Sequence, residues 1–400
     1  MRILFLAHRI PYPPNKGEKI RAFHELEFLR SHGHSVDVFA LVDDPEEAEF
    51  AEGLRSHCSS VSVARVGWPG KFAGAAGAIV SGRPLSLPFF YSRELAGKVR
   101  EALRQFSYDA LFVYSTAMMQ YVPRDTRVPI LLDFVDADSS KWRQYAGSAA
   151  FPLSLVYSRE ASLLNRYELE SARRSRHCFF VSEKEIRAAG MQEVQNVSAV
   201  ENGVVIPSPD SSAGTPARQP YVAFVGQMNY RPNTDAVVWF AGEILPLIRL
   251  RRPEVRFVIV GREPSPEVTR LARLAGVEVT GEVREVVPYI RGAAAVVAPF
   301  RISQGIHNKM LEALAAGVPI VSTPPAVEAI RPSLRAPILV AENAQDFASA
   351  VLRVLVDDQY RTLAKENVSR VESEQSWTAT LRPIEHILKE VTGGPSVSIR

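Results

Sequence analysis

Short apolar runs alternate with helical stretches along nearly the whole chain, and this alternation constrains the fold more than any other feature. The first run, Ile3–Ala7, is continuous, as expected for a strand that is buried on both faces. A loop rich in proline follows, then helical spacing over Lys19–His32, and a second strand begins at Val36. Strand, loop, helix and strand in this order form a βαβ unit, which predicts a parallel sheet.

The same alternation occurs twice, on either side of a segment without apolar periodicity. That segment, 207–220, is rich in proline and serine and predicts a linker. We therefore expect an α/β protein in which two Rossmann-like parallel-sheet domains, 1–206 and 221–375, face each other across a cleft. A final helical stretch, 376–392, is expected to return to the N-terminal domain. The length of 400 residues agrees with this division.

Composition excludes several classes of protein. With 46% hydrophobic and 23% charged residues the chain is too apolar to be disordered, and a net charge of +3 is too small for a dedicated nucleic-acid binder. Two cysteines, Cys58 and Cys178, are too few for a disulfide framework or a thiolate zinc site, which favours a reducing cytoplasm. No apolar run approaches the length of a membrane-spanning helix. We expect a cytoplasmic protein with no nucleic-acid partner.

The strongest motif follows the strand predicted to end near Pro299. A polar loop containing Gly305 leads into a helix that should begin near Asn308 or Lys309. Free N–H groups at a helix start favour a phosphate, and Lys309 adds a cation there. Glu312, about one turn further on, is placed to accept two hydrogen bonds from the hydroxyls of a ribose. The alternative interpretation is a capped helix with ordinary surface side chains.

The segment Gly305–Val321 resembles the nucleotide-binding signature of retaining glycosyltransferases of family four, which have the GT-B fold of two Rossmann-like domains. Further motifs of that family occur in the expected order over nearly the whole chain, at Pro13–Arg21, Gly33–Val36, Val200–Val204, Phe224–Asn233, Val260–Arg262 and Thr280–Val283. The resemblance implies transfer of a sugar from a nucleotide-diphosphate sugar to a glycan or lipid-linked acceptor, with retention. It also implies an acceptor-binding N-terminal domain, a nucleotide-sugar-binding C-terminal domain and no required cofactor or metal.

The residues expected to bind the nucleotide sugar lie in loops that follow strands, or at the start of the helix after Gly305. They are Gly17, Gly226, Arg231, Gly261, Arg262, Gly281, Glu282, Val283, Gln304, Gly305, Ile306, His307, Asn308, Lys309 and Glu312. Gly17 allows close approach of the backbone to a ligand, and Glu18 and Arg21 on the helix start behind it favour that role over a simple turn. Arg231 is either a diphosphate ligand or a solvated loop arginine.

Catalytic roles are expected for Asp136, Asp138, Lys309 and Arg231. Helix N–H groups, Lys309 and Arg231 would stabilise a leaving diphosphate. The two aspartates lie just beyond a strand end, where they are placed to accept a proton from a sugar hydroxyl or to stabilise positive charge on the sugar. A divalent metal site and capping of the following turn are the alternatives.

One departure from the family affects the donor. The family carries a glutamate eight positions before the ribose-binding one, and a glycine three positions after that first glutamate. This chain has Gln304 and His307 at these two positions. Ribose binding through Glu312 does not depend on either position, but the identity of the donor sugar no longer follows. A nucleotide-sugar epimerase of the same fold and a degenerate nucleotide-sugar-binding subunit therefore stay open. An NAD dehydrogenase is disfavoured because neither first strand is followed by Gly-x-Gly-x-x-Gly.

Two further segments bear on partners. Leu132–Trp142 is similar to a sugar-transferase subgroup associated with bacterial exosortase and exopolysaccharide systems, which implies a role in surface-glycan synthesis. Trp68–Arg83 is apolar, glycine-rich and flanked by cations. It is interpreted either as a connection packed on its own domain or as a peripheral contact with the inner membrane surface or a lipid-linked acceptor.

Overall fold

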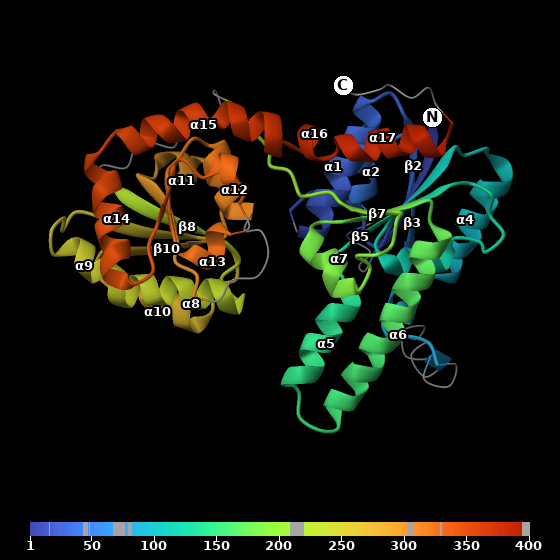
Figure 1. Ribbon diagram of the computed structural model, residues 1–400, viewed down its shortest axis with the longest axis horizontal. Coiled ribbons are helices and arrows are strands. Elements are labelled where there is room, and N and C mark those ends of the chain that lie inside the picture. The colour runs from blue at the N-terminus through green and yellow to red at the C-terminus, as the bar shows by residue number, and fades with distance from the viewer. Residues whose placement is uncertain are drawn as a thin grey trace. The chain divides into compact units, whose positions relative to one another are not determined.

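The computed structural model describes residues 1–15, 17–42, 47, 49–66, 77–78, 82–208, 220–301, 308–328 and 330–393. The chain divides into two compact units, the first formed by Met1–Asn202 together with the chain from Thr380 onward, the second by Gly203–Ala379. Each unit contains one parallel sheet with helices on both faces (Figure 1). Among the described helices, none combines the length and the apolar character needed to cross a bilayer.

The first unit is built on a seven-stranded sheet in the order β3-β2-β1-β4-β5-β6-β7. Every described pairing is parallel, and Ile3 of β1 lies beside Val36 of β2 and Ala110 of β4. Residues 3–7 are fully buried, as the continuous apolar run predicts. The strands are β1 (Arg2–Ala7), β2 (Ser35–Val42), β3 (Ser60–Arg65), β4 (Ala110–Tyr114), β5 (Ile130–Val135), β6 (His177–Phe180) and β7 (Val197–Ala199).

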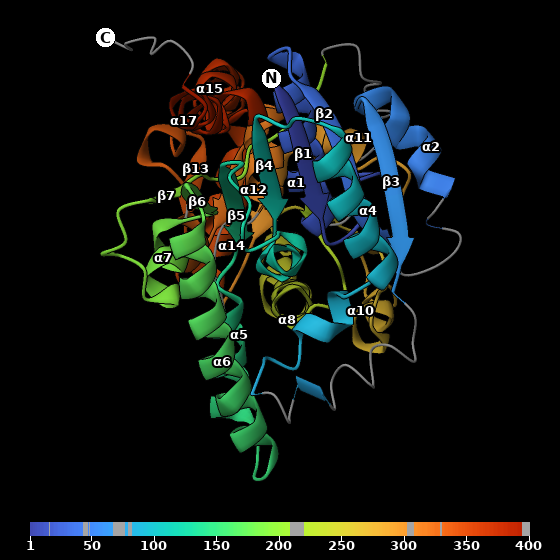
Figure 2. The same cartoon turned by 90° about the vertical axis from the view of Figure 1, so that its right-hand side faces the viewer.

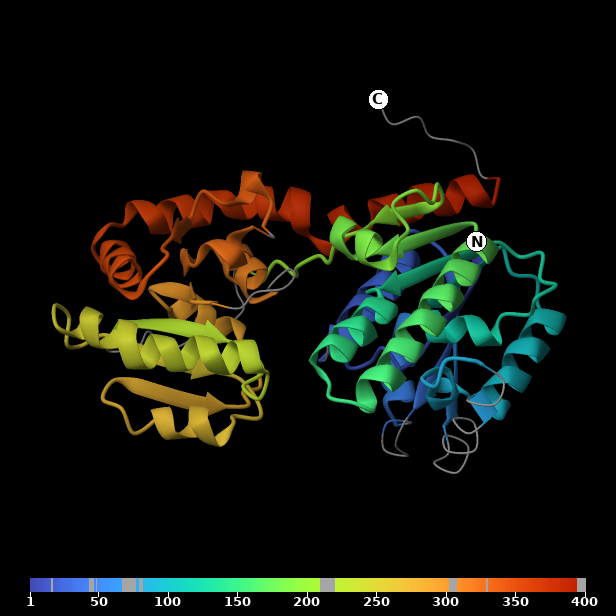
Figure 3. The ribbon, with the colours of Figure 1, turned by 60° about the horizontal axis from the view of Figure 1, so that its bottom comes forward.

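Helices form a layer on each face of this sheet. On one side lie α1 (Gly17–Ser31), α2 (Phe50–Leu54), the 3-10 turn η2 (Arg55–His57) and α17 (Arg382–Val391). On the other lie η3 (Leu87–Phe90), α4 (Arg93–Gln105), η4 (Thr116–Tyr121), α6 (Leu153–Arg174) and α7 (Glu183–Ala189). Helix α5 (Asp138–Ser148) packs along α6 as a hairpin that extends beyond the sheet (Figures 2 and 3). The last helix is fixed to this unit by His34, whose Nε2 lies 2.8 Å from Oε2 of Glu385.

The local sequence predicts the start of α7 but does not predict α5. The Ser182 hydroxyl accepts a hydrogen bond from the Glu185 N–H at 3.3 Å, as expected for a capping box. The Glu185 carboxylate does not return to Ser182 and instead accepts the Ala137 N–H at 2.9 Å, which joins α7 to the loop after β5. No helix is predicted from the sequence over 138–148, and the structure shows a helix of eleven residues there.

A buried ionic cluster joins three segments of the first unit: α1, β5 and the residues that follow β7. Arg21 of α1 is 1% exposed, and its Nε lies 2.6 Å from Asp133 of β5 and 3.0 Å from Glu25. Its Nη1 donates to the Val200 carbonyl at 2.8 Å and to Asn202 Oδ1 at 3.0 Å. On the sequence alone, Arg21 favours a ligand role for the loop around Gly17. The structure removes that support, because the Arg21 side chain points into the interior.

The second unit has a six-stranded parallel sheet in the order β10-β9-β8-β11-β12-β13. Its strands are β8 (Tyr221–Val225), β9 (Arg256–Val260), β10 (Val277–Gly281), β11 (Ala295–Ala298), β12 (Ile320–Ser322) and β13 (Ile338–Val340). The helices are α8 (Arg231–Trp239), α9 (Leu245–Arg249), α10 (Pro266–Leu271), α11 (Val287–Gly292), α12 (Asn308–Ala315), α13 (Pro324–Val327), α14 (Ala344–Val356), α15 (Gln359–Gln375) and α16 (Trp377–Thr380), with the 3-10 turn η6 (Pro332–Leu334).

One expected helix is interrupted. Sequence periodicity predicts a single helix over 234–250, but a π-helical turn, Phe240–Ile244, separates α8 from α9. Pro246 follows this turn and has no N–H to donate to the carbonyl four residues earlier. The wider turn accommodates that missing hydrogen bond while Phe240 stays fully buried in the core.

The ionic cluster generates a stability prediction. Arg21→Met keeps most of the side-chain volume but leaves Asp133 and Glu25 buried without their cation, so the free energy of unfolding should fall by about 3–5 kcal/mol. Arg30→Met, on the same helix, is the matched control: Arg30 pairs with Glu27, its side chain is 51% exposed, and about 1 kcal/mol or less should be lost. Urea unfolding of both variants measures the difference. Equal small losses would contradict a central role for the cluster.

Candidate functional site

The strand order of each sheet identifies where a ligand site is expected. In both units the order reverses beside the first strand, between β1 and β4 in one sheet and between β8 and β11 in the other. Loops that leave adjacent strands at such a reversal diverge to opposite faces, and ligands bind in the gap beyond the carboxyl ends. In the second unit the residues that follow β8 and β11 are Gly226 and Pro299, close to the predicted motif.

Glycines occupy the carboxyl ends of three adjacent strands in the second unit. Gly226 follows β8, Gly261 follows β9 and Gly281 ends β10, with N–H···O bonds of 3.0 Å from Gly226 to Val260 and 3.1 Å from Gly261 to Gly281. A Cβ on Gly261 would lie 1.6 Å from the Gly226 carbonyl oxygen, so no larger residue fits. A Cβ on Gly226 would lie 2.9 Å from Lys309 Nζ. Glycine is therefore required at these two strand ends by the close approach of the Gly226 carbonyl and of the Asn233 and Lys309 side chains.

Lys309 is held by specific contacts in this place. Its Nζ donates to Asn233 Oδ1 at 2.7 Å and lies 4.2 Å and 4.7 Å from the ring centroids of Phe224 and Phe300. Burial lowers the pKa of Lys309 to about 7, and the nearby Glu312 carboxylate opposes that shift. The amine therefore loses its proton more readily than an exposed lysine does, and an incoming anion would favour its charged form.

Glu312 lies on the same side of α12 as Lys309, three residues on. Burial raises the pKa of its carboxyl group, and the Lys309 cation lowers it again. No hydrogen bond to another side chain occupies Glu312 within the described part of the chain. Its carboxylate is therefore available to a polar ligand beside the helix start.

The other predicted positions of this unit lie around the same edge. Arg231 is the first residue of α8, is exposed, and sits two positions before Asn233, the hydrogen-bond partner of Lys309. Arg262 follows Gly261, and its carbonyl accepts the Met228 N–H at 3.0 Å. Glu282 is exposed after β10, whereas Val283 packs against the core. Asn308 begins α12. Gln304, Gly305, Ile306 and His307 lie outside the described residues.

In the first unit two residues at strand ends have strained backbone. Ser115 follows β4 with φ of 76°, and Val135 ends β5 with φ of 68°. Positive φ is costly for a β-branched residue and persists only where surrounding contacts impose it. Here the Val135 N–H donates to Asp133 Oδ1 at 2.8 Å and its carbonyl accepts the Val181 N–H at 2.9 Å. Nothing in the local sequence indicates this strain, which re-aims the chain just before Asp136.

Asp136 and Asp138 surround the start of α5. Burial, followed by the charges of Glu185, Asp138 and Asp133, raises the pKa of Asp136 to about 6, although Asp136 is exposed at the surface of its own unit. Burial also raises the pKa of Asp138. Neither carboxylate caps α5, whose N-cap is Ala137. Across the described ranges no three His, Cys, Asp or Glu side chains are grouped to hold a metal.

Gly17 begins α1 at the same edge. A Cβ added there would meet no atom within 4 Å, so packing does not require a glycine. Its conformation is not left-handed either. The structure therefore supplies no internal reason for glycine at this position, and a role in close approach to a ligand stays a prediction.

Comparisons with known proteins agree with the two-sheet fold described above. Residues 219–357 match the family model described as Glycosyl transferases group 1. The structure is similar to Anabaena HepE in complex with UDP (TM-score 0.65, 16% identity, covering 98% of this chain and 100% of that one). It is also similar to sucrose-phosphate synthase from Thermosynechococcus elongatus (TM-score 0.64, 17% identity, 98% and 99% covered). A search of curated proteins finds no match. At these identities the likeness shows the fold, and it confirms the two predicted Rossmann-like sheets of the GT-B architecture.

The buried lysine generates a pH prediction. Between about pH 7 and pH 10 the unfolded chain keeps a proton on Lys309 that the folded chain has released. The free energy of unfolding should therefore rise with pH in this range, by at most about 1.4 kcal/mol per pH unit from this group. Lys309→Met should remove that slope, and Lys365→Met, at an exposed position of α15, should keep it. Urea unfolding at several pH values checks this. Parallel curves for wild type and Lys309→Met would show that Lys309 keeps its proton in the folded state.

Proposed function

We propose that this chain is a glycosyltransferase that moves a sugar from a nucleotide-diphosphate sugar to a glycan or lipid-linked acceptor, with retention at the anomeric carbon. The observation that carries the proposal is the arrangement at the carboxyl edge of the second sheet. There Gly226 and Gly261 allow the strand ends to pack closely, Lys309 brings an amine beside Gly226, and the first turn of α12, like that of any helix, has N–H groups without an intrahelical partner. This edge lies within the part of the chain that matches the group 1 family model.

The arrangement suits a diphosphate next to a ribose. Helix N–H groups and a lysine stabilise phosphate oxygens, and the Glu312 carboxylate is placed one turn along the same helix to accept the two ribose hydroxyls. HepE is described with UDP and with UDP-glucose, which makes uridine nucleotides the first donors to test. Gln304 and His307 would face the donor sugar, and their departure from the family pattern concerns the choice of that sugar.

The proposed chemistry requires charge stabilisation more than a protein base. The bond between the anomeric carbon and the diphosphate oxygen breaks, and its electron pair goes to the leaving diphosphate, which Lys309 and Arg231 would stabilise. The acceptor hydroxyl forms the new bond to carbon, and its proton goes to the leaving phosphate. Asp136 or Asp138 would stabilise positive charge on the sugar or position the acceptor. No metal takes part in these steps.

The setting of the reaction is part of the proposal. The likeness of Leu132–Trp142 to the exosortase-associated subgroup supports surface-glycan or exopolysaccharide synthesis in the cytoplasm. Residues 68–83, of which only 77–78 and 82–83 are described, would then contact the inner membrane surface or the lipid of an acceptor. A connection packed on its own domain stays the alternative for this segment.

The ribose assignment has a direct test. Glu312→Ala removes a carboxylate that would accept two hydroxyl hydrogen bonds, so UDP binding should weaken by roughly 30-fold to 1000-fold, equivalent to about 2–4 kcal/mol. The fold should change little, because alanine is favourable inside a helix. Glu366→Ala, an exposed position of α15, is the control and should bind UDP like wild type. Calorimetry on the three proteins measures the effect. Unchanged affinity in a folded Glu312→Ala protein would remove the ribose assignment.

Turnover separates the proposed function from its alternatives. The full chain is incubated with radiolabelled nucleotide sugars and a panel of glycan and lipid-linked acceptors, with and without excess chelator. Transfer of label to an acceptor, unchanged by chelator, is expected. A rearranged sugar nucleotide without transfer would indicate an epimerase, and binding without turnover would indicate a degenerate subunit. Transfer that chelator abolishes and a divalent ion restores would make Asp136 and Asp138 candidate metal ligands.

A further inference from the structure

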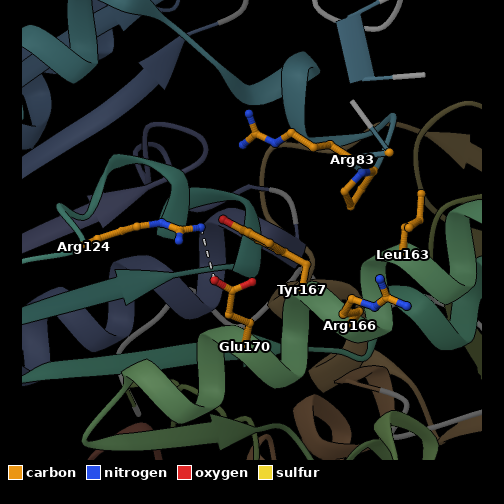
Figure 4. Close-up of a pocket in the computed structure, with 8 residues that line it drawn as sticks. Arg83, Arg124, Leu163, Arg166, Tyr167 and Glu170 are labelled. Atoms are coloured by element: carbon orange, nitrogen blue, oxygen red, sulfur yellow. Dashed lines mark hydrogen bonds and ion pairs between the residues drawn. The ribbon is translucent and has the colours of Figure 1, made fainter. Parts of the chain in front are cut away.

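A pocket of about 520 Å³ opens in the helical layer of the first unit, away from the residues assigned to sugar transfer. Its walls come from three segments: residues 82–84, the turn after η4, and the middle of α6. It is lined by Gly82, Arg83, Pro84, Arg124, Leu163, Arg166, Tyr167 and Glu170 (Figure 4). Three arginines face one carboxylate, so the lining carries a net positive charge.

The walls of this pocket are fixed to α6. The Glu160 carboxylate, 1% exposed, accepts the Leu85 N–H at 2.6 Å and both the N–H and the hydroxyl of Ser86 at 2.8 Å. These bonds fix the segment that carries Arg83. On the other side Arg174 Nη2 donates to the carbonyls of Val122 and Pro123 at 3.0 and 3.3 Å, next to Arg124. Segments held in this way lose little freedom when a ligand binds.

Tyr167 provides an unused donor in the same place. Its ring packs against the core, and its hydroxyl is buried without a hydrogen-bond partner among the described residues. Figure 4 shows that hydroxyl directed toward the guanidinium end of Arg124, and the charge of Arg83 also acts on it. Burial raises the pKa of Tyr167 to about 12, and the charges of Arg174, Arg83 and Arg124 oppose the shift, so the hydroxyl stays protonated and able to donate. A buried unpaired hydroxyl costs free energy unless a ligand or water supplies an acceptor.

The arginines around this hydroxyl are available to a ligand. Arg83 forms no ion pair with another described residue. Arg124 lies 3.3 Å from Glu170, but their side chains are 86% and 49% exposed, and an exposed pair of this kind is weak. Guanidinium groups match the geometry of phosphate oxygens and bind them through paired hydrogen bonds.

We propose that this pocket is a binding site for a phosphate group, held by Arg83, Arg124 and the Tyr167 hydroxyl. The remaining volume, toward Leu163 and Arg166, takes the rest of the molecule that carries the phosphate. The site belongs to a different unit from the proposed nucleotide site, and phosphate binding there does not depend on sugar transfer. Arg83 also ends the segment 68–83 that is proposed above to contact a membrane or an acceptor. The same phosphate chemistry is offered by a soluble phosphorylated compound and by the headgroup of an anionic lipid.

The test begins with inorganic phosphate, titrated into the full chain by calorimetry. Wild type should bind it, and Arg83→Gln should weaken binding about tenfold through loss of charge-assisted hydrogen bonds. Tyr167→Phe keeps the ring and removes only the donor, so a severalfold loss is expected without a change in fold. Arg173→Gln, an exposed arginine on the same helix outside the pocket lining, is the matched control and should bind like wild type.

Two further arms identify the site and the source of the phosphate. Lys309→Met should still bind phosphate. Three results would overturn the proposal: no phosphate binding by wild type, an equal loss of binding in Arg173→Gln, or loss of binding in Lys309→Met while Arg83→Gln still binds. Vesicles of phosphatidylcholine with phosphatidylglycerol form the second arm. Vesicle binding that is lost in Arg83→Gln and Tyr167→Phe and is displaced by phosphate indicates a lipid headgroup. Phosphate binding without vesicle binding indicates a soluble phosphorylated ligand.

Discussion

The buried amine of Lys309, and the contacts that hold it, are the feature on which the carboxyl edge of the second sheet depends. It joins the first turn of α12 to the first turn of α8 through Asn233, and it lies against the rings of Phe224 and Phe300 from the strand and loop beneath. Its presence also explains why position 226 is a glycine, because a side chain there would meet the amine. This one side chain thus holds together the starts of α8 and α12, the helices that follow β8 and β11.

That arrangement is unfavourable for stability and favourable for binding an anion. Burial makes the charged amine expensive, as its lowered pKa of about 7 shows, and Asn233 supplies a neutral partner in place of a carboxylate. An amine held this way is neutralised best by a ligand that brings its own negative charge, and perturbed groups of this kind concentrate at functional sites.

The sequence predicts those parts of the fold that are decided locally. The continuous run at residues 3–7 specifies a buried strand, and the residues from Asn308 onward are helical, as the motif predicts. Features decided by tertiary contacts escape such reasoning. Arg21 at a helix start is expected to serve a ligand loop, yet Asp133, more than a hundred residues away, draws it into the interior. The left-handed Val135 and the unpaired Tyr167 hydroxyl likewise have no local signature.

Hydrogen exchange of the full chain with and without UDP tests the central claim most directly, since it reports where the nucleotide binds without assuming any residue's role. The backbone amides of Gly226–Asn233 and of the first turn of α12 should exchange more slowly when UDP is present, because the ligand accepts hydrogen bonds from that edge and restrains it. Amides along α6 and α17 should be unaffected. Protection confined to the first unit, or no protection at the start of α12 at saturating UDP, would contradict a nucleotide site built around Lys309.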